Sequence, residues 1–329
     1  MTSPGHLTDE LAEVSRSAAA VAAACEGLDA RAVLALFAQA GLLGAGAPGS
    51  CGGLDLPLEF DAAIIDAIAP KLLDDPVLDA MLAARYCPDV DVARALVDGR
   101  VLVASSFDGA LTATAAGADV IVTGTARDVA HGVSADFLLA PVDLDGRELL
   151  AVIDLGDKVT RRPVLDGLDP ERRAAHIVVK GQTLPPHRVA DAAADWRGDG
   201  LLLSARWLLA HASLCLGMTA DFVSSRQQFG QPLSVFQSVR FALASAAEEL
   251  RSLDLLASPA GPRADRCAAY CYAAQIVPPV IERCMHLHGG MGYTEEVPLH
   301  AHLRRARARI LAISTEPAFA EIVDAMIAH

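Results

Sequence analysis

The chain has 329 residues, of which 53% are hydrophobic, 21% charged and 5% aromatic, and its formal net charge is −14 at pH 7. This composition is typical of an Ala-, Leu- and Val-rich helical protein with a large core, and it excludes a disordered chain. The acidic balance argues against nucleic acid or an anionic membrane as a partner, because both attract clustered Lys and Arg.

The sequence also indicates where the protein resides. Residues 1–6 contain neither the basic nor the apolar segment of a secretory signal. The most apolar helical stretch, Trp207–Met218, is shorter than the roughly 20 apolar residues needed to span a bilayer. Seven scattered cysteines without CxxC pairs indicate reduced, mostly buried thiols. We therefore expect a cytoplasmic protein that does not enter a membrane.

The first 190 residues divide into a helical part and a strand-rich part. Apolar residues recur at helical spacing over most of 7–98, with a Gly- and Pro-rich break at 44–53. From about residue 100, short β-branched runs are separated by Gly and Asp turns, which predicts an antiparallel β domain. These runs are Val101–Ala104, Asp119–Gly124, Asp136–Pro141, Leu149–Asp154 and Ala175–Lys180.

The last third of the chain is predicted to be helical again. The expected helices cover 201–225, 237–257, 264–288 and a segment within 300–328. Helices and strands that occur in blocks, rather than in alternation, predict an α+β fold. The predicted domains are an N-terminal helical domain (1–99), a middle antiparallel β domain (100–190) and a C-terminal four-helix bundle (191–329).

One candidate binding motif joins two of the C-terminal helices. It extends from Arg226 to Gln237 and contains Phe229 and Gly230 at a predicted turn. The Arg226 guanidinium and the Gln237 carboxamide suit a phosphate ester, since a guanidinium forms strong charge-assisted hydrogen bonds with phosphate oxygens. The motif holds no nucleophile or base, so it is predicted to bind rather than to react.

A second candidate motif, His286–Tyr293, follows the third C-terminal helix. Gly289, Gly290 and Gly292 leave backbone that a ligand can approach closely, because no Cβ is in the way. This motif also lacks a nucleophile or a base. It is predicted to be a second part of a binding site.

Three further patterns are less informative. The GxGxxG spacing of Gly44–Gly49 lacks a preceding strand, so a helix–loop–helix connection explains it better than a dinucleotide site. The Arg304–Arg309 run is either an ion-paired or solvated helix face, or a cofactor-phosphate or subunit contact. A third pattern combines soft metal ligands. Side chains two residues apart on a helix point in different directions, so no metal site is predicted. The members of this pattern are Cys284, His286, His288, His300 and His302.

Taken together, the two motifs and the block order resemble the acyl-CoA dehydrogenase family. The resemblance implies FAD at a subunit interface, held largely by a neighbouring chain. Arg226, Phe229 and Gln237 would contact its pyrophosphate–adenosine part, and Gly289 and Gly290 would line the same ADP moiety. His286 stands where the family usually has glutamine.

The departures from the family pattern concern the reactive half of the site. Of the family's two positions for the catalytic glutamate, one holds Ala205 here. The other falls in Ile313–Pro317, where Glu316 is displaced and followed by proline. The flavin-contacting middle loop is replaced by Ala104–Ala110, and no tryptophan occurs near Ala130–His131. The resemblance therefore implies a chain that retains the part of the site donated to a neighbour.

This asymmetry resembles the smaller subunit of bacterial α2β2 heterotetrameric acyl-CoA dehydrogenases of the steroid side-chain CoA type. It implies a larger partner subunit that supplies the glutamate, an acyl-CoA substrate in a widened pocket, and electron-transfer flavoprotein as a further partner. One alternative is a self-sufficient homotetramer with Glu316 or Glu249 as base. Another is a non-catalytic structural or metal-binding relative.

Overall fold

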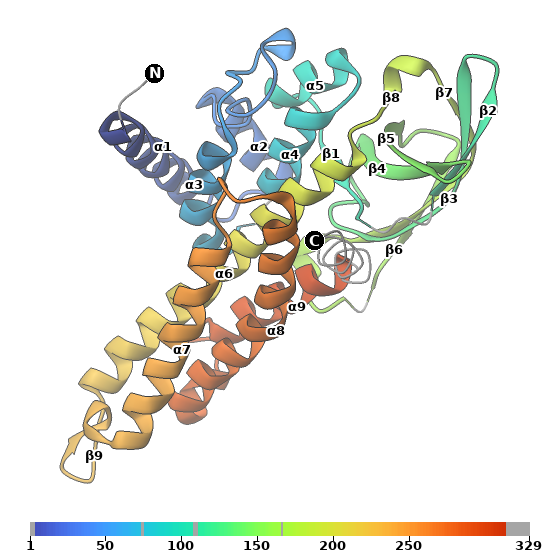
Figure 1. The fold of residues 1–329 in the computed structure, drawn as a ribbon. Coiled ribbons are helices and arrows are strands. Elements are labelled where there is room, and N and C mark those ends of the chain that lie inside the picture. The colour runs from blue at the N-terminus through green and yellow to red at the C-terminus, as the bar shows by residue number, and fades with distance from the viewer. Residues whose placement is uncertain (1–3, 74–75, 108–110, 166, 314–329) are drawn as a thin grey trace.

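A computed structural model describes residues 4–73, 76–107, 111–165 and 167–313, in the predicted order of helices, strands and helices (Figure 1). Asp29 separates the first two helices, because its side chain accepts a hydrogen bond from the Ala32 N–H and caps the second. Asp89 caps the fifth helix in the same way. The N-terminal helices are α1 (Pro4–Ala24), α2 (Ala30–Gln39), α3 (Leu58–Ile68), α4 (Val77–Tyr86) and α5 (Val90–Val97).

The Gly44–Gly49 segment lies between α2 and α3 and is a loop that leads into a short 3₁₀ turn, as the helix–loop–helix interpretation requires. Gly46 is needed for packing within the chain. A Cβ at Gly46 would lie 1.9 Å from a terminal nitrogen of the partly buried Arg85 guanidinium. This guanidinium donates to the buried Asp61 at 2.7 Å. The glycines here therefore admit a neighbouring side chain.

The middle of the chain forms a sheet whose strand order is β6-β7-β3-β2-β4-β5-β8, with β1 also paired to β4. Most neighbours are antiparallel, but β1 and β2 both run parallel to β4. The predicted middle β domain is therefore confirmed and mostly antiparallel, but the two parallel pairings with β4 were not predicted. The strands are β1 (Val103–Ser105), β2 (Leu111–Ala116), β3 (Asp119–Val129), β4 (Phe137–Leu144), β5 (Arg147–Asp154), β6 (Val159–Pro163), β7 (Ala175–Leu184) and β8 (Val189–Ala190).

The last block is a four-helix bundle that extends away from the N-terminal helices and the sheet (Figure 1). Its helices are α6 (Ala193–Ser225), α7 (Gln237–Leu256), α8 (Arg263–Leu287) and α9 (Leu299–Ala312). The 33-residue α6 is much longer than the predicted apolar stretch, and by length and composition it could cross a membrane. Since 61% of its most apolar window is buried, it serves here as the central helix of the core.

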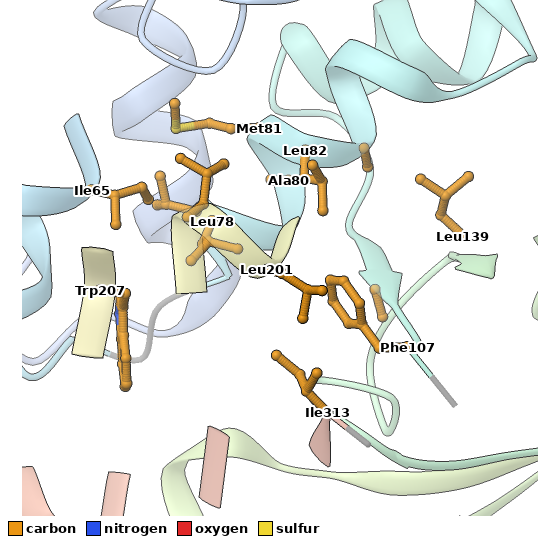
Figure 2. Packing of buried hydrophobic residues seen from close by; sticks show 14 of the residues in the cluster. Ile65, Leu78, Ala80, Met81, Leu82, Phe107, Leu139, Leu201, Trp207 and Ile313 are labelled. Carbon is orange, nitrogen blue, oxygen red and sulfur yellow. The ribbon is translucent and has the colours of Figure 1, made fainter. Parts of the chain in front are cut away.

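One continuous hydrophobic cluster joins the three blocks. In Figure 2, Leu78 of α4 lies close to Leu201 of α6, and Phe107 lies beside Ile313. Helix gives way to strand between Val97 and Val103, and strand to helix between Ala190 and Ala193. The changes in secondary structure thus fall close to the predicted domain limits, and the division into domains stays a prediction.

Candidate cofactor-binding site and domain junction

Residues 226–237, called the arm below, link α6 to α7 at the end of the bundle farthest from the sheet (Figure 1). The arm contains a small hairpin of β9 (Gln227–Gln228) and β10 (Gln231–Pro232). The two turn residues, Phe229 and Gly230, have φ values of 54° and 79°. A bulky side chain is uncommon at positive φ, and such strain often marks a functional contact. The Phe229 side chain is 91% exposed, and its ring lies edge-on to that of Phe236 in the same arm, with centroids 6.2 Å apart.

The polar groups of the arm are held by backbone hydrogen bonds. The Arg226 N–H donates to the Phe222 carbonyl at 2.8 Å, and the Arg226 carbonyl accepts from Leu233 N–H at 2.9 Å. Both Arg226 and Gln237 are exposed. Within the described part of the chain, the Arg226 guanidinium makes no hydrogen bond or ion pair. The Arg226 guanidinium and the Gln237 carboxamide are thus both available on the surface of the chain.

Residues 289–292, called the glycine segment, lie at the same end of the bundle. The Phe222 ring of α6 stacks on His288 after α8, with centroids 4.3 Å apart. Gly289 and Gly290 are exposed, and a Cβ on either would meet no atom within 4 Å. Gly292 differs, because its Cβ would lie 2.3 Å from the Met285 carbonyl oxygen. Gly292 therefore serves internal packing, whereas Gly289 and Gly290 leave backbone open to the outside.

An FAD molecule has an ADP half and an isoalloxazine half, and the residues at this end of the bundle concern the ADP half. The arm and the glycine segment fit the ADP half, because they combine a guanidinium, an amide and bare backbone on one exposed end of the bundle. His286 is exposed on the last turn of α8, beside the glycine segment. All six residues predicted to bind the cofactor thus lie on the arm, in the glycine segment or, for His286, beside it.

A second region, called the junction, lies where the N-terminal helices, the sheet and the bundle meet. It encloses a cavity of about 50 Å³. Pockets that hold drug-sized ligands have volumes of about 300–1,000 Å³, so this one has room for a few waters at most. The lining residues include Leu78, Asp79, Ala130, His131, Asp169, Trp207, Arg305 and Arg309.

Arg309 of α9 fills one side of the junction. It donates to Asp79 of α4 at 3.0 Å and to the Ser204 hydroxyl of α6 at 3.0 and 3.2 Å. The guanidinium carbon lies 5.8 Å from the centre of the Phe107 ring, a distance at which cations are attracted to aromatic rings. Phe107 in turn stacks on Trp196, with centroids 4.5 Å apart.

Arg305, one turn earlier on α9, fills the other side. It donates to Asp169 at 2.9 Å and to the Leu73 carbonyl at 2.5 Å, and it also pairs with Glu171. Arg172, which follows Glu171 in the 3₁₀ turn Pro170–Arg172, donates to the Ala308 carbonyl at 3.1 Å. The inward half of the basic run is therefore buried and ion-paired, while Arg307 is exposed and pairs with Glu282.

The positions that the resemblance assigns to the flavin ring and the base converge on this junction. Ala130 and His131 line it, and Phe107 contacts Arg309. Ala205 is completely buried on α6, next to Ser204, and Ile313 is buried beside Phe107 (Figure 2). Ala205 fills one of the two glutamate positions, and of the other segment, Ile313–Pro317, only Ile313 belongs to the described residues. The isoalloxazine half of FAD does not fit here.

The two named alternatives for a base lie elsewhere. Glu249 is on α7, where it accepts from Arg283 of α8 at 3.3 Å and from the Ser245 hydroxyl at 3.4 Å. It is part of the bundle surface and is not a residue of the junction. Glu316 lies outside the described residues.

The candidate metal ligands are dispersed. His286 is exposed, and the His288 ring Nδ1 lies 2.9 Å from the Cys284 carbonyl. His302 faces His211 of α6, with the two Nδ1 atoms 2.7 Å apart. Among the described residues no three His, Cys, Asp or Glu side chains form a metal site. The cysteines of the chain are free and mostly buried, as predicted.

The buried histidine pair predicts a stability that depends on pH. Burial, together with the nearby Arg305 charge, lowers the pKa of His302 to about 4 from its ordinary 6.5, and burial also lowers the pKa of His211. The unfolded chain then binds more protons than the folded chain below pH 6.5, so stability should fall as pH drops from 6.5 to 4. For His302 alone the loss is on the order of 3 kcal/mol.

Urea unfolding across this pH range measures the effect. His302→Asn should flatten the profile between pH 6.5 and 4, because an amide does not titrate. His286→Asn is the matched control, since His286 is exposed at the end of α8. If His302→Asn and the unaltered chain lose stability in parallel over this interval, His302 is not its cause.

A groove of about 770 Å³ lies between α6 and α7. Its walls are mostly apolar and include Leu214, Gly217 and Ala247. The charged residues at one end pair with one another, since Arg206 binds both Asp66 and Asp254. The groove therefore presents no free acid or base.

Comparison with known sequences supports these observations. The family model described as acyl-CoA dehydrogenase, C-terminal domain, matches residues 201–313. Acyl-CoA dehydrogenase FadE28 of Mycobacterium tuberculosis is 29% identical over 197 residues, which are 55% of this chain and about half (55%) of that protein. Acyl-CoA dehydrogenase FadE27 of the same organism is 26% identical over 309 residues, which are 84% of this chain and 82% of that protein.

Solved structures share the fold at lower identity. A variant of the Tcur3481-Tcur3483 steroid ACAD has a TM-score of 0.87 at 19% identity, covering 98% of both chains. The ChsE4-ChsE5 complex from M. tuberculosis has a TM-score of 0.85 at 21% identity, covering 99% of this chain and 98% of that one. A glutaryl-CoA dehydrogenase from Mycobacterium smegmatis, solved with FADH2, has a TM-score of 0.80 at 16% identity, covering 97% of this chain and 95% of that one. The bundle sequence thus matches the acyl-CoA dehydrogenase C-terminal domain, and the arrangement of helices, sheet and bundle is the acyl-CoA dehydrogenase fold.

Proposed function

We propose that this chain is one subunit of a heteromeric, FAD-dependent acyl-CoA dehydrogenase, in which it binds the ADP half of an FAD whose ring lies in a partner chain. One observation carries the proposal. The Arg226 guanidinium stands exposed beside bare glycine backbone, at the far end of α6 from the junction. A chain that held a whole FAD for itself would not need to present a phosphate-binding group outward.

The arm residues have distinct proposed roles. Arg226 would bind the pyrophosphate through charge-assisted hydrogen bonds, and the Gln237 amide would bind the ribose or a phosphate. Gly289 and Gly290 would admit the ADP moiety close to the backbone. Phe229, exposed on its strained turn, would insert against the partner chain or the adenine.

The proposed reaction is the α,β-dehydrogenation of an acyl-CoA thioester. FAD supplies the hydride acceptor when it is bound. A carboxylate must remove the α-proton. Asp79, Asp169 and Glu249 of this chain are each paired with an arginine, so we assign the carboxylate to a larger partner subunit of the same family.

The narrower parts of the proposal are the assembly and its substrate. Two copies of each subunit would form an α2β2 tetramer in the cytoplasm, with electron-transfer flavoprotein as the electron acceptor. A steroid side-chain CoA thioester is the proposed substrate, and the similarity of this chain to the Tcur3481-Tcur3483 steroid ACAD supports it. The assembly and the substrate are proposed separately from the similarity of this chain to acyl-CoA dehydrogenases.

Co-purification with a larger acyl-CoA dehydrogenase subunit tests the proposal. The complex should contain one FAD for every two chains, and this chain purified alone should be colourless and inactive. A yellow, active homo-oligomer of this chain alone would contradict it. In that case Glu316→Gln, which keeps the size of the side chain, would test whether Glu316 is the base of a homotetramer.

A further inference from the structure

The closure of the junction is a property of the side chains that meet there. Asp79, Asp169, Arg305 and Arg309 have side-chain exposures of 6%, 7%, 9% and 12%. They come from α4, from the turn before β7 and from α9, so the two ion pairs tie all three blocks together. We infer that Arg305 and Arg309 close this junction permanently to an isoalloxazine ring and to an acyl chain.

The physical reason is that an entering ring would leave the buried Asp79 carboxylate without its Arg309 partner. A planar ring at this position would have to separate Arg309 from Asp79 or displace Phe107 from between Arg309 and Trp196. Neither an aromatic ring nor an acyl chain supplies the cation that Asp79 would lose. A buried carboxylate without a partner is strongly unfavourable. The open form is therefore not an accessible minor state of this chain.

The inference deepens the proposed function, on which it rests for the identity of the cofactor. Catalytic sites in the assembly would then be limited by the number of partner chains, even if a carboxylate were restored at Ala205. Arg305 and Arg309 are positioning residues in this scheme. They hold α9 against α4 and against the turn Pro170–Arg172, and they touch no substrate.

A flavin ring without its ADP half tests the closure directly. Lumiflavin titrated into the purified full-length chain should show no saturable quenching of its fluorescence, and iodide should quench it as it quenches free lumiflavin. The complex stripped of FAD is the positive control and should protect one lumiflavin per two chains. Saturable, iodide-protected binding to this chain alone would overturn the inference.

The role of the two arginines has its own readout, because both tryptophans of the chain report on this region. Trp207 lines the junction, and Trp196 stacks on Phe107. Arg309→Ala should raise acrylamide quenching of tryptophan at least twofold, whereas Arg307→Ala should leave it unchanged. Arg309→Lys, which keeps the charge but cannot reach Asp79 and Ser204 together, should give an intermediate increase. Unchanged quenching in both Arg309 variants, with folding confirmed by circular dichroism, would overturn the assignment.

These measurements need neither the partner nor activity. Failure of the proposed function would appear as a missing complex or a wrong flavin count, while the lumiflavin and tryptophan results could still hold. Failure of the inference would appear as ring binding in this chain, even with a correct complex. The two outcomes are therefore distinguishable.

Discussion

Replacing Arg309 with alanine should lower the free energy of unfolding by about 3–5 kcal/mol, since it leaves the Asp79 carboxylate buried without a partner. The Arg309 guanidinium also donates to Ser204 and covers Phe107, so truncation removes packing as well as charge. Urea unfolding of the purified chain measures the difference.

The matched control is Arg307→Ala, two residues away on the same helix. Arg307 and Glu282 have side-chain exposures of 50% and 45%, and an exposed ion pair contributes about 0–1 kcal/mol. The double variant Asp79→Leu/Arg309→Met should recover much of the loss, because it removes both buried charges together. Equal effects at positions 307 and 309 would show that burial does not distinguish the two arginines.

Replacing Arg226 with alanine should weaken FAD retention by the proposed complex without destabilising this chain. A hydrogen bond to a charged group is worth about 1.5–3 kcal/mol, which corresponds to a roughly 10- to 150-fold rise in the dissociation constant. Its exposed guanidinium has no partner within the described part of the chain, so urea unfolding should change by less than about 0.5 kcal/mol. Fluorescence of released FAD on dilution of the complex gives the dissociation constant.

Arg251→Ala provides the comparison for Arg226. Arg251 is a 69% exposed cation of α7 that pairs with Asp254 and lies away from the arm. Its loss changes the net charge by the same amount, so a general electrostatic effect on FAD would affect both variants. FAD affinity that stays unchanged in Arg226→Ala, or falls equally in Arg251→Ala, would remove the arm from the proposed site.

The candidate binding end of the molecule could be recognised in the sequence because its residues are close together in the chain. Arg226, Phe229 and Gln237 lie within one loop, and Gly289 and Gly290 are adjacent, so local pattern alone indicates a shared surface. Proximity of the two motifs follows from helices of similar length running back and forth. The Phe222–His288 stack, which fixes that proximity, gives no recognisable sequence signal.

The junction could not be predicted in the same way, because its partners are far apart along the chain. Arg309 and Asp79 are separated by 230 residues, and Arg305 and Asp169 by 136. The i,i+4 spacing of Arg305 and Arg309 does place both on one helix face. That spacing could have indicated that half of the basic run points inward, but it does not identify the acidic residues with which these arginines pair.

The sheet shows a similar division. The long β-branched runs predicted β3, β4, β5 and β7, whereas the Ala- and Thr-rich β2 and the exposed, Arg-containing β6 gave no such run. The parallel pairing of β1 and β2 with β4 depends on the path of the chain between strands. Strand periodicity carries no information about that path.

The length of α6 has a consequence for how the two halves of the molecule can communicate. Ser204, at the junction, and Ser225, at the arm, belong to the same unbroken helix, and at 1.5 Å per residue they are about 32 Å apart. Disturbances at such a distance normally combine additively. Substitutions in the arm can therefore change its surface without loosening the interior, and substitutions in the interior can accumulate while the surface of the arm is preserved.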